Sequence, residues 1–180
     1  MAVESPSSSK QPDAFDLLGL PARFDLDGEV IERAFYERSK ELHPDKFASA
    51  PAAERVVALS RSRALNDAYQ TLKKPVGRAE YLLERSGVTI GENERLDPVT
   101  IMAVLELREE LAEARAAKAM PKIEALQTEM QQRRKRDLAE LDRLFVQQDL
   151  DGIKRVLIGL RYVDRYLEEC DAALDADEAQ

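Results

Sequence analysis

The chain has 180 residues, of which 44% are hydrophobic and 34% charged, and its formal net charge is −8 with a pI near 4.9. An acidic chain repels nucleic acid and anionic membranes, and the few glycines among many Ala, Leu and Glu residues favour helices over sheets. The single cysteine, Cys170, rules out an intrachain disulfide and any multi-cysteine metal site. No apolar stretch approaches membrane-spanning length. We therefore expect an all-α cytoplasmic protein with no cofactor, no metal, and neither nucleic acid nor membrane as a partner.

Residues 1–13 are rich in serine and proline, and they predict a disordered tail. A short apolar helical turn follows and ends before Pro21. The next helix begins after Asp25 or Asp27, either of which can cap it, and it continues to about Leu42. Residues 14–75 are predicted to form the first domain.

A third helix is expected from Pro51 to Lys73, because proline suits the first helical turn. A further short helix from Arg78 to Arg85 ends at a Ser-Gly pair, and a polar loop follows it. Residues 76–97 are therefore predicted to be a linker helix and loop.

The second half of the chain has the pattern of a helical bundle. Asp97 can cap a helix that reaches about Met120, Pro121 opens a second helix, and a polar turn near residues 148–151 leads into a third. Three long helices joined by short turns must pack together to bury their apolar stripes, so residues 98–175 predict a three-helix bundle. The expected stripes of the second and third helices are Ile123, Leu126, Met130, Leu138, Leu141 and Phe145, and Ile153, Val156, Leu157, Leu160, Val163, Leu167 and Cys170.

The tripeptide His43-Pro44-Asp45 lies between two predicted antiparallel helices and precedes Lys46. Pro44 stiffens the turn, so His43 and Asp45 are presented with little ordering entropy left to lose on binding. The chain shows no Cys/His pair, no Ser/His/Asp constellation and no phosphate-binding glycine loop, so we do not expect an enzyme.

In these features the chain resembles a J-domain. The similarity covers about residues 13–75 and rests on Phe15–Leu20, on the His43–Lys46 loop and on Leu65–Leu72. The resemblance implies that His43, Pro44 and Asp45 stimulate ATP hydrolysis by a DnaK-type chaperone. The basic face that would meet the chaperone consists of Arg33, Lys40 and Lys46, with Arg38 nearby. Glu32, Glu37 and Glu41 on the same helix depart from the usual pattern, and pairing with the basic residues would weaken this face.

The helix after Asp97 has more apolar surface than one core needs. One stripe consists of Val104, Leu107, Leu111 and Ala114, and the other side carries Ile101, Met102, Leu105, Glu106, Glu109 and Glu113. The last helix adds Ile158, Tyr162 and Tyr166, spaced by four residues off its main core face. An apolar patch bordered by carboxylates is typical of a binding surface. By pattern alone, burial against the first domain or the linker explains these stripes equally well.

Three further segments resemble the HscB family of J-proteins of bacterial iron–sulfur cluster assembly: Arg78–Leu83, Leu105–Leu111 and Leu160–Asp164. The resemblance implies a two-domain elbow, with a J-domain helical hairpin and a bundle that binds an iron–sulfur cluster scaffold protein (IscU-like) for delivery to a DnaK-type (HscA-like) chaperone. The scaffold-binding residues would be Ile101, Met102, Leu105, Glu106, Glu109, Glu113 and Tyr162. Tyr162 stands where the family usually has phenylalanine, and Ile101 where it has leucine.

Two alternatives remain at this point. One is a J-domain co-chaperone with a different client. The other is a helical nucleic-acid or structural adaptor that uses the basic run Arg133–Arg136.

Overall fold

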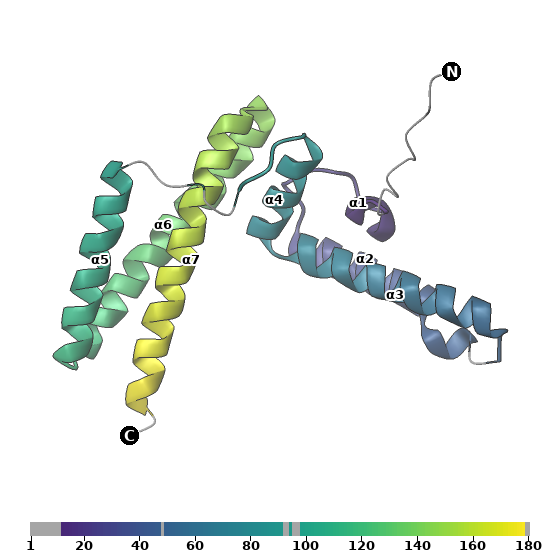
Figure 1. The fold of residues 1–180 in the computed structure, drawn as a ribbon, viewed down its shortest axis with the longest axis horizontal. Helices are drawn as coiled ribbons and strands as arrows, with labels where there is room; N and C mark the ends of the chain where they lie inside the picture. Colours follow the sequence, from purple (N-terminus) through teal and green to yellow (C-terminus); the bar gives the residue numbers. More distant parts are fainter. Residues whose placement is uncertain (1–11, 48, 92–93, 95–97, 179–180) are drawn as a thin grey trace, which may run out of the picture. The chain divides into compact units, whose positions relative to one another are not determined.

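The computed structural model describes residues 12–47, 49–91, 94 and 98–178, and within these the regular structure is entirely helical (Figure 1). The all-α prediction is confirmed. The chain divides into two compact units, Met1–Tyr81 and Leu82–Gln180. Most of the predicted tail, residues 1–11, lies outside the described residues. Asp13, which the prediction included in that tail, caps the first helix, and its side chain accepts hydrogen bonds from the backbone N–H groups of Phe15 and Asp16.

The first unit contains a helical hairpin. Its elements are α1 (Ala14–Leu18), α2 (Gly28–Leu42), the 3-10 helix η1 (Pro44–Phe47), α3 (Ala52–Lys73) and the beginning of α4 (Pro75–Arg85). Helices α2 and α3 run antiparallel, with η1 at their connection (Figure 1). Of the two candidate caps of α2, Asp27 accepts the backbone N–H of Glu29 at 2.9 Å, whereas Asp25 pairs with Arg23 at 3.3 Å.

Apolar residues from α1, α2 and α3 form the core of the first unit: Phe15, Ile31, Leu65 and Leu72 are almost completely buried. Across the hairpin, the ring of Phe35 stacks on that of Tyr69. These residues recur at helical spacing, so burial of their stripes orients the two long helices toward each other.

Helix α4 is tied to the first unit by two polar side chains. Arg78 is only 5% exposed, donates a hydrogen bond to the carbonyl of Leu72 at 2.9 Å and lies 5.5 Å from the centre of the Phe24 ring. The hydroxyl of Tyr81 accepts the backbone N–H of Ala14 at 2.9 Å. The helix starts at Pro75 rather than at the predicted Arg78, because a proline fits the first helical turn.

The second unit contains three long helices that pack side by side (Figure 1). They are α5 (Pro98–Ala116), α6 (Met120–Gln147) and α7 (Leu150–Glu178). Helix α5 ends before the predicted Met120, because Lys118 adopts a left-handed conformation with φ 52° and the N–H of Ala119 turns back to the carbonyl of Ala114. One part of the bundle core consists of Leu111, Ala114, Ile123, Leu126, Met130, Tyr166, Cys170 and Ala173.

Most residues of the two expected stripes are buried in the bundle core, and Leu144 is buried with them. The others are half-buried: Leu138, Phe145, Val156 and Leu167. Ile158 and Tyr166 are also buried, although we placed them off the core face of the last helix. Helix α7 packs against both α5 and α6, so a wider arc of its surface is covered than one neighbour would need. The hydroxyl of Tyr166 donates to the carbonyl of Leu107 at 3.0 Å, which satisfies its polar end.

Among the helices described, none is both long and apolar enough to cross a membrane. The described residues contain no group of three or more His, Cys, Asp or Glu side chains arranged to hold a metal ion.

Candidate functional site

The His43-Pro44-Asp45 loop is exposed at the tip of the hairpin. His43 ends α2 in an extended conformation, as expected for a residue before proline, and η1 begins at Pro44. The backbone N–H of Asp45 donates to Nδ1 of His43 at 3.3 Å. The side chains of His43 and Asp45 are 58% and 89% exposed. Nδ1 of His43 also lies 3.4 Å from Oδ2 of Asp45, so the loop presents the imidazole and the carboxylate together to a partner.

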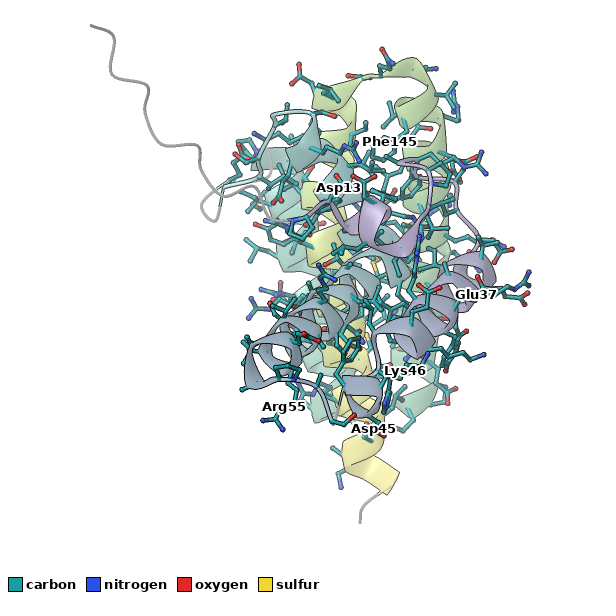
Figure 2. The ribbon with its side chains drawn as sticks, turned by 90° about the vertical axis from the view of Figure 1, so that its right-hand side faces the viewer. Asp13, Glu37, Asp45, Lys46, Arg55 and Phe145 are labelled. Atoms are coloured by element: carbon teal, nitrogen blue, oxygen red, sulfur yellow. The ribbon has the colours of Figure 1, made fainter. Side chains whose placement is uncertain are left out.

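Basic side chains lie along α2 and η1 on the surface of the first unit. Arg33, Lys40 and Lys46 are all exposed. Figure 2 shows Lys46 beside Asp45 at one end of the hairpin and Glu37 farther along α2.

Of the three glutamates expected to pair with basic residues on α2, Glu41 forms an ion pair among the described residues. Among the described residues, the ion pair on α2 joins Arg38 to Glu41 at 3.5 Å. The guanidinium of Arg38 also lies over Gly19, whose φ of 70° requires a residue that tolerates the left-handed region. Arg33 and Lys40 are therefore left facing solvent, and the basic face is less weakened than the sequence indicated.

Helix α5 has two different faces. Leu111 and Ala114 are buried in the bundle, whereas Met102 and Leu105 are 58% and 53% exposed. The exposed side also carries Glu106, Glu109 and Glu113, and Ile101 is half-buried beside it. The surplus apolar residues of this helix are thus on the surface of the second unit, bordered by carboxylates.

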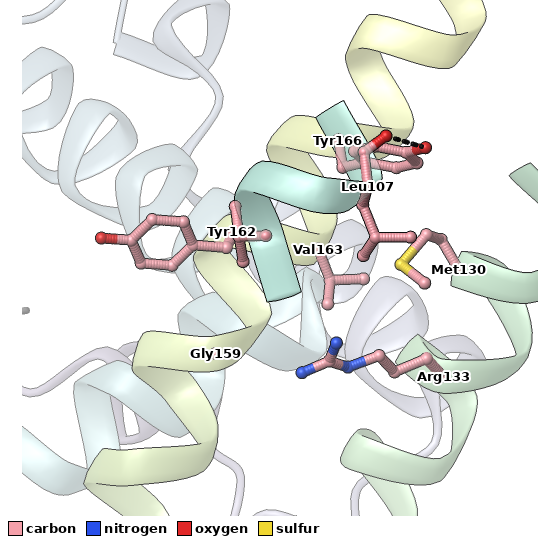
Figure 3. Close-up of a pocket in the computed structure, with 8 residues that line it drawn as sticks. Leu107, Met130, Arg133, Gly159, Tyr162, Val163 and Tyr166 are labelled. Carbon is pink, nitrogen blue, oxygen red and sulfur yellow. Dashed lines mark hydrogen bonds between the residues drawn. The ribbon is translucent and has the colours of Figure 1, made fainter. Parts of the chain in front are cut away.

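Tyr162 of α7 is half-buried and lines a small pocket with Val104 and Leu107 of α5 and Arg133 of α6. Its hydroxyl end points away from Arg133 and Met130 (Figure 3). Since Val104 directly precedes Leu105, Tyr162 lies next to the helix that carries the exposed apolar residues.

Val99 is an exposed apolar residue of α5 that the sequence reasoning missed. Its side chain is 79% exposed, and it lies in the first turn of the helix, just before Met102. Val99 is the first apolar residue of the helix, and helical periodicity is recognised only from apolar residues on both sides of a position, so the sequence pattern did not single it out.

The basic run Arg133–Arg136 contributes ion pairs within the bundle. Arg134 contacts Asp164 of α7 at 2.6 Å, and Arg133 lies 3.8 Å from Asp137. Burial raises the pKa of Asp137, and the charges of Arg133 and Arg136 offset part of this effect. Two of the four basic residues are therefore paired with carboxylates, which disfavours a nucleic-acid contact.

Comparison with known proteins assigns both units. Residues 13–81 match the family model of the DnaJ domain, and residues 96–171 match that of the HSCB C-terminal oligomerisation domain. A co-chaperone protein HscB homolog of Burkholderia mallei (strain SAVP1) is 35% identical over 163 residues, which are 89% of this chain and 93% of the relative. A homolog of the same name from Vibrio vulnificus (strain YJ016) is 48% identical over 101 residues, and this match spans only 59% of the relative's length and 55% of this chain.

Solved structures agree with this assignment. The chaperone HscB from Vibrio cholerae superimposes with a TM-score of 0.83 at 33% sequence identity, covering 91% of this chain and 98% of that one. The human co-chaperone HscB also has a TM-score of 0.83, at 24% identity, covering 96% of this chain and 85% of its own, which indicates a shared fold. Together with the exposed His43-Pro44-Asp45 loop, these matches show that the chain belongs to the HscB family of J-domain co-chaperones, which is not a family of enzymes.

Proposed function

We propose that the chain is a two-ended adaptor of iron–sulfur cluster biogenesis in the cytoplasm. Its bundle binds a cluster scaffold protein (IscU-like), and its J-domain stimulates the ATPase of a DnaK-type (HscA-like) chaperone. The observation that carries the proposal is that one chain has both an exposed His43–Asp45 loop and an exposed apolar surface around Leu105 bordered by glutamates.

The chaperone end consists of the loop and the basic face of α2. A rigid turn that presents the imidazole of His43 and the carboxylate of Asp45 can enter a polar site with little loss of conformational entropy. The exposed charges of Arg33, Lys40 and Lys46 favour an acidic partner surface and raise the rate of encounter.

The scaffold end consists of α5 and Tyr162. Met102 and Leu105 supply exposed apolar area, and an aromatic ring beside aliphatic side chains is a good interface anchor. Glu106, Glu109 and Glu113 would orient a partner with a basic surface.

Because the chain binds scaffold and chaperone at once, delivery of the scaffold needs only moderate affinity for each partner. A scaffold bound to the second unit has a high effective concentration near the chaperone. Chaperone ATP hydrolysis, promoted by the loop, then closes the chaperone on the scaffold and weakens the scaffold's hold on its cluster.

The test is the steady-state ATPase rate of the chaperone with the full chain added, in the presence and absence of scaffold. We expect stimulation that His43→Gln abolishes, and further enhancement by scaffold that a Leu105→Ala/Tyr162→Ala double variant loses. Val146→Ala removes another exposed apolar side chain, 86% exposed on α6, and serves as the matched control. Stimulation that persists in His43→Gln would contradict the chaperone role. Stimulation that never responds to scaffold would instead favour a J-domain co-chaperone with a different client.

A further inference from the structure

Gly159 lies in the interior of the long helix α7, where a glycine is unfavourable because its backbone loses more freedom on folding than that of any other residue. The residue is half-buried. Apart from its chain neighbours and the backbone of its own helix, no described atom lies within 4 Å of the position that a Cβ atom would take. Packing among the described residues therefore does not require a glycine here.

The open position beside Gly159 belongs to a pocket between α5 and α7. Val104 and Leu107 of α5 face Tyr162 and Val163 of α7 across it, and we call this the Gly159 pocket (Figure 3). Farther along α5, Leu111 is buried in the core of the bundle. The two helices are thus closely packed at Leu111, whereas α7 offers no side chain to α5 at the level of Gly159.

The size and the lining of the Gly159 pocket restrict its occupant. Its volume of about 10 Å³ is close to the space that one water-sized group needs, and sites for small-molecule ligands are far larger. Aliphatic side chains form much of the lining, which favours an apolar group. The guanidinium of Arg133 points from α6 toward the same region, which disfavours a cationic group (Figure 3). The pocket therefore fits the tip of one branched aliphatic side chain.

We propose that the Gly159 pocket receives a valine, leucine or isoleucine side chain of the scaffold protein, and that Gly159 sets how large this side chain can be. This inference rests on the proposed function and deepens it. The pocket is continuous with the proposed scaffold surface, because Tyr162 belongs to both and Val104 directly precedes the exposed Leu105. Glycine also allows the backbone of a partner to approach α7 closely.

The charges around the pocket favour the scaffold over a second copy of this chain. Glu106, Glu109 and Glu113 are exposed on α5 beside the apolar surface. Two copies that met through this surface would bring two sets of these carboxylates together, which costs free energy. A partner that presents an aliphatic side chain within a basic surface matches both the pocket and the carboxylates.

Calorimetric titration of the IscU-like scaffold protein into the full chain tests this inference, together with the thermal midpoint of each variant. Gly159→Leu fills the pocket, so we expect about tenfold weaker scaffold binding. Gly159→Ala adds one methyl group and should weaken binding several-fold while it raises the thermal midpoint by about 2–4 °C. Ala172→Leu adds bulk at an exposed position of α7 outside the pocket and should leave binding unchanged.

Two results separate a receptor pocket from a merely structural glycine. A glycine needed for packing would make Gly159→Ala less stable, whereas the open space beside it predicts greater stability together with weaker binding. Tyr162→Ala removes one wall of the pocket, so the added methyl group should weaken binding less in that background than in the wild type. Additive effects of the two substitutions would contradict a shared pocket.

The outcomes also distinguish this inference from the function on which it rests. If Gly159→Leu and Gly159→Ala bind scaffold like the wild type while Leu105→Ala binds more weakly, the pocket role is wrong and the scaffold-binding function stands. Loss of a dimer in Gly159→Leu at unchanged scaffold affinity would assign the pocket to a second copy of the chain and overturn the inference. If the wild type does not bind scaffold, the proposed function fails and the pocket role fails with it.

Discussion

The ring of Phe35 on α2 stacks on the ring of Tyr69 on α3, with centroids 4.2 Å apart and planes inclined by 15°. This pair joins the two long helices of the hairpin that ends in the His43-Pro44-Asp45 loop. Tyr69 is buried and Phe35 half-buried, so the pair belongs to the core of the first unit and also supports the exposed Tyr36.

Removal of the Phe35 ring should destabilise the first unit. Phe35→Ala leaves a cavity and loses the aromatic pair, so we expect the free energy of unfolding to fall by about 2–3 kcal/mol, less than for a fully buried phenylalanine. Phe35→Leu keeps most of the volume and should cost about 1 kcal/mol. Denaturant unfolding of the full chain measures both values, and Tyr36→Ala is the matched control for an exposed neighbour. Equal stability of Phe35→Ala and Tyr36→Ala would show that the stack contributes nothing.

The basic face of α2 should act mainly at low salt. Arg33→Ala and Lys40→Ala should each raise the concentration for half-maximal ATPase stimulation several-fold at low ionic strength, and the differences should shrink as salt screens the charges. Arg143→Ala on α6 removes another exposed arginine, which pairs with Glu140, and serves as the control. A salt-independent effect of Lys40→Ala would indicate a packing role instead.

The sequence predicted the fold class and most element boundaries because helical spacing and proline positions are local signals. Asp27 and Pro98 mark helix starts in the structure as predicted, whereas α4 starts at Pro75, three residues before the predicted Arg78. The exposed loop at His43 followed from the proline after it.

The sequence could not decide which surplus apolar residues are buried, because that depends on the neighbours of each helix. Ile158 and Tyr166 are buried since α7 has two neighbours, α5 and α6, whereas Leu105 remains on the surface of α5. The hydrogen bond from Tyr166 to the carbonyl of Leu107 joins residues 59 positions apart, and no local pattern encodes it. The left-handed turn at Lys118 likewise lacks the glycine that usually signals one.

Truncation of the exposed Leu105 and of the buried Ile158 should have opposite effects on scaffold binding and on stability. Leu105→Ala removes an exposed side chain, so we expect a change of unfolding free energy within about 0.5 kcal/mol but about tenfold weaker binding of the scaffold. Ile158→Ala removes a buried one and should cost about 2–4 kcal/mol of stability. Calorimetric titration with scaffold and denaturant unfolding measure the two effects. Loss of stability in Leu105→Ala would mean that this residue is part of the core.

Asp137 should make the bundle less stable as its carboxyl ionises. Burial raises the pKa of Asp137, although Arg133 and Arg136 act in the opposite direction. A raised pKa in the folded state means that ionisation costs more there than in the unfolded chain, so this contribution is absent at acid pH and grows as pH rises through the folded-state pKa.

Asp137→Asn should therefore be more stable than the wild type at pH 7 by less than about 1 kcal/mol, and the difference should vanish below about pH 3. Thermal unfolding of both proteins at pH 7 and at about pH 3 shows which of the two is more stable at each pH. A less stable Asp137→Asn at pH 7 would show that the 3.8 Å contact with Arg133 outweighs the cost of burial.

Cys170 should limit the stability of the bundle at alkaline pH. The thiol is completely buried in α7, and burial, followed by the charges of Asp171 and Glu169, raises its pKa to about 11. The folded state thus favours the neutral thiol. This contribution to stability is fully present below the ordinary thiol pKa near 9 and is lost as pH rises from about 9 to 11, by roughly 2 kcal/mol.

Cys170→Ala should be less stable than the wild type at pH 8, because it leaves a cavity, but its stability should decline less between pH 9 and 11. Burial also raises the pKa of Tyr166, and the charge of Cys170 adds to this effect, so the difference between the two curves reports the thiol together with its coupling to Tyr166. At pH 8 an aromatic disulfide reagent should modify Cys170 slowly in the folded chain and rapidly in denaturant, since the reactive thiolate is scarce and covered. Rapid modification of the folded protein would contradict the burial on which this prediction depends, and parallel curves for the two proteins would contradict the raised pKa.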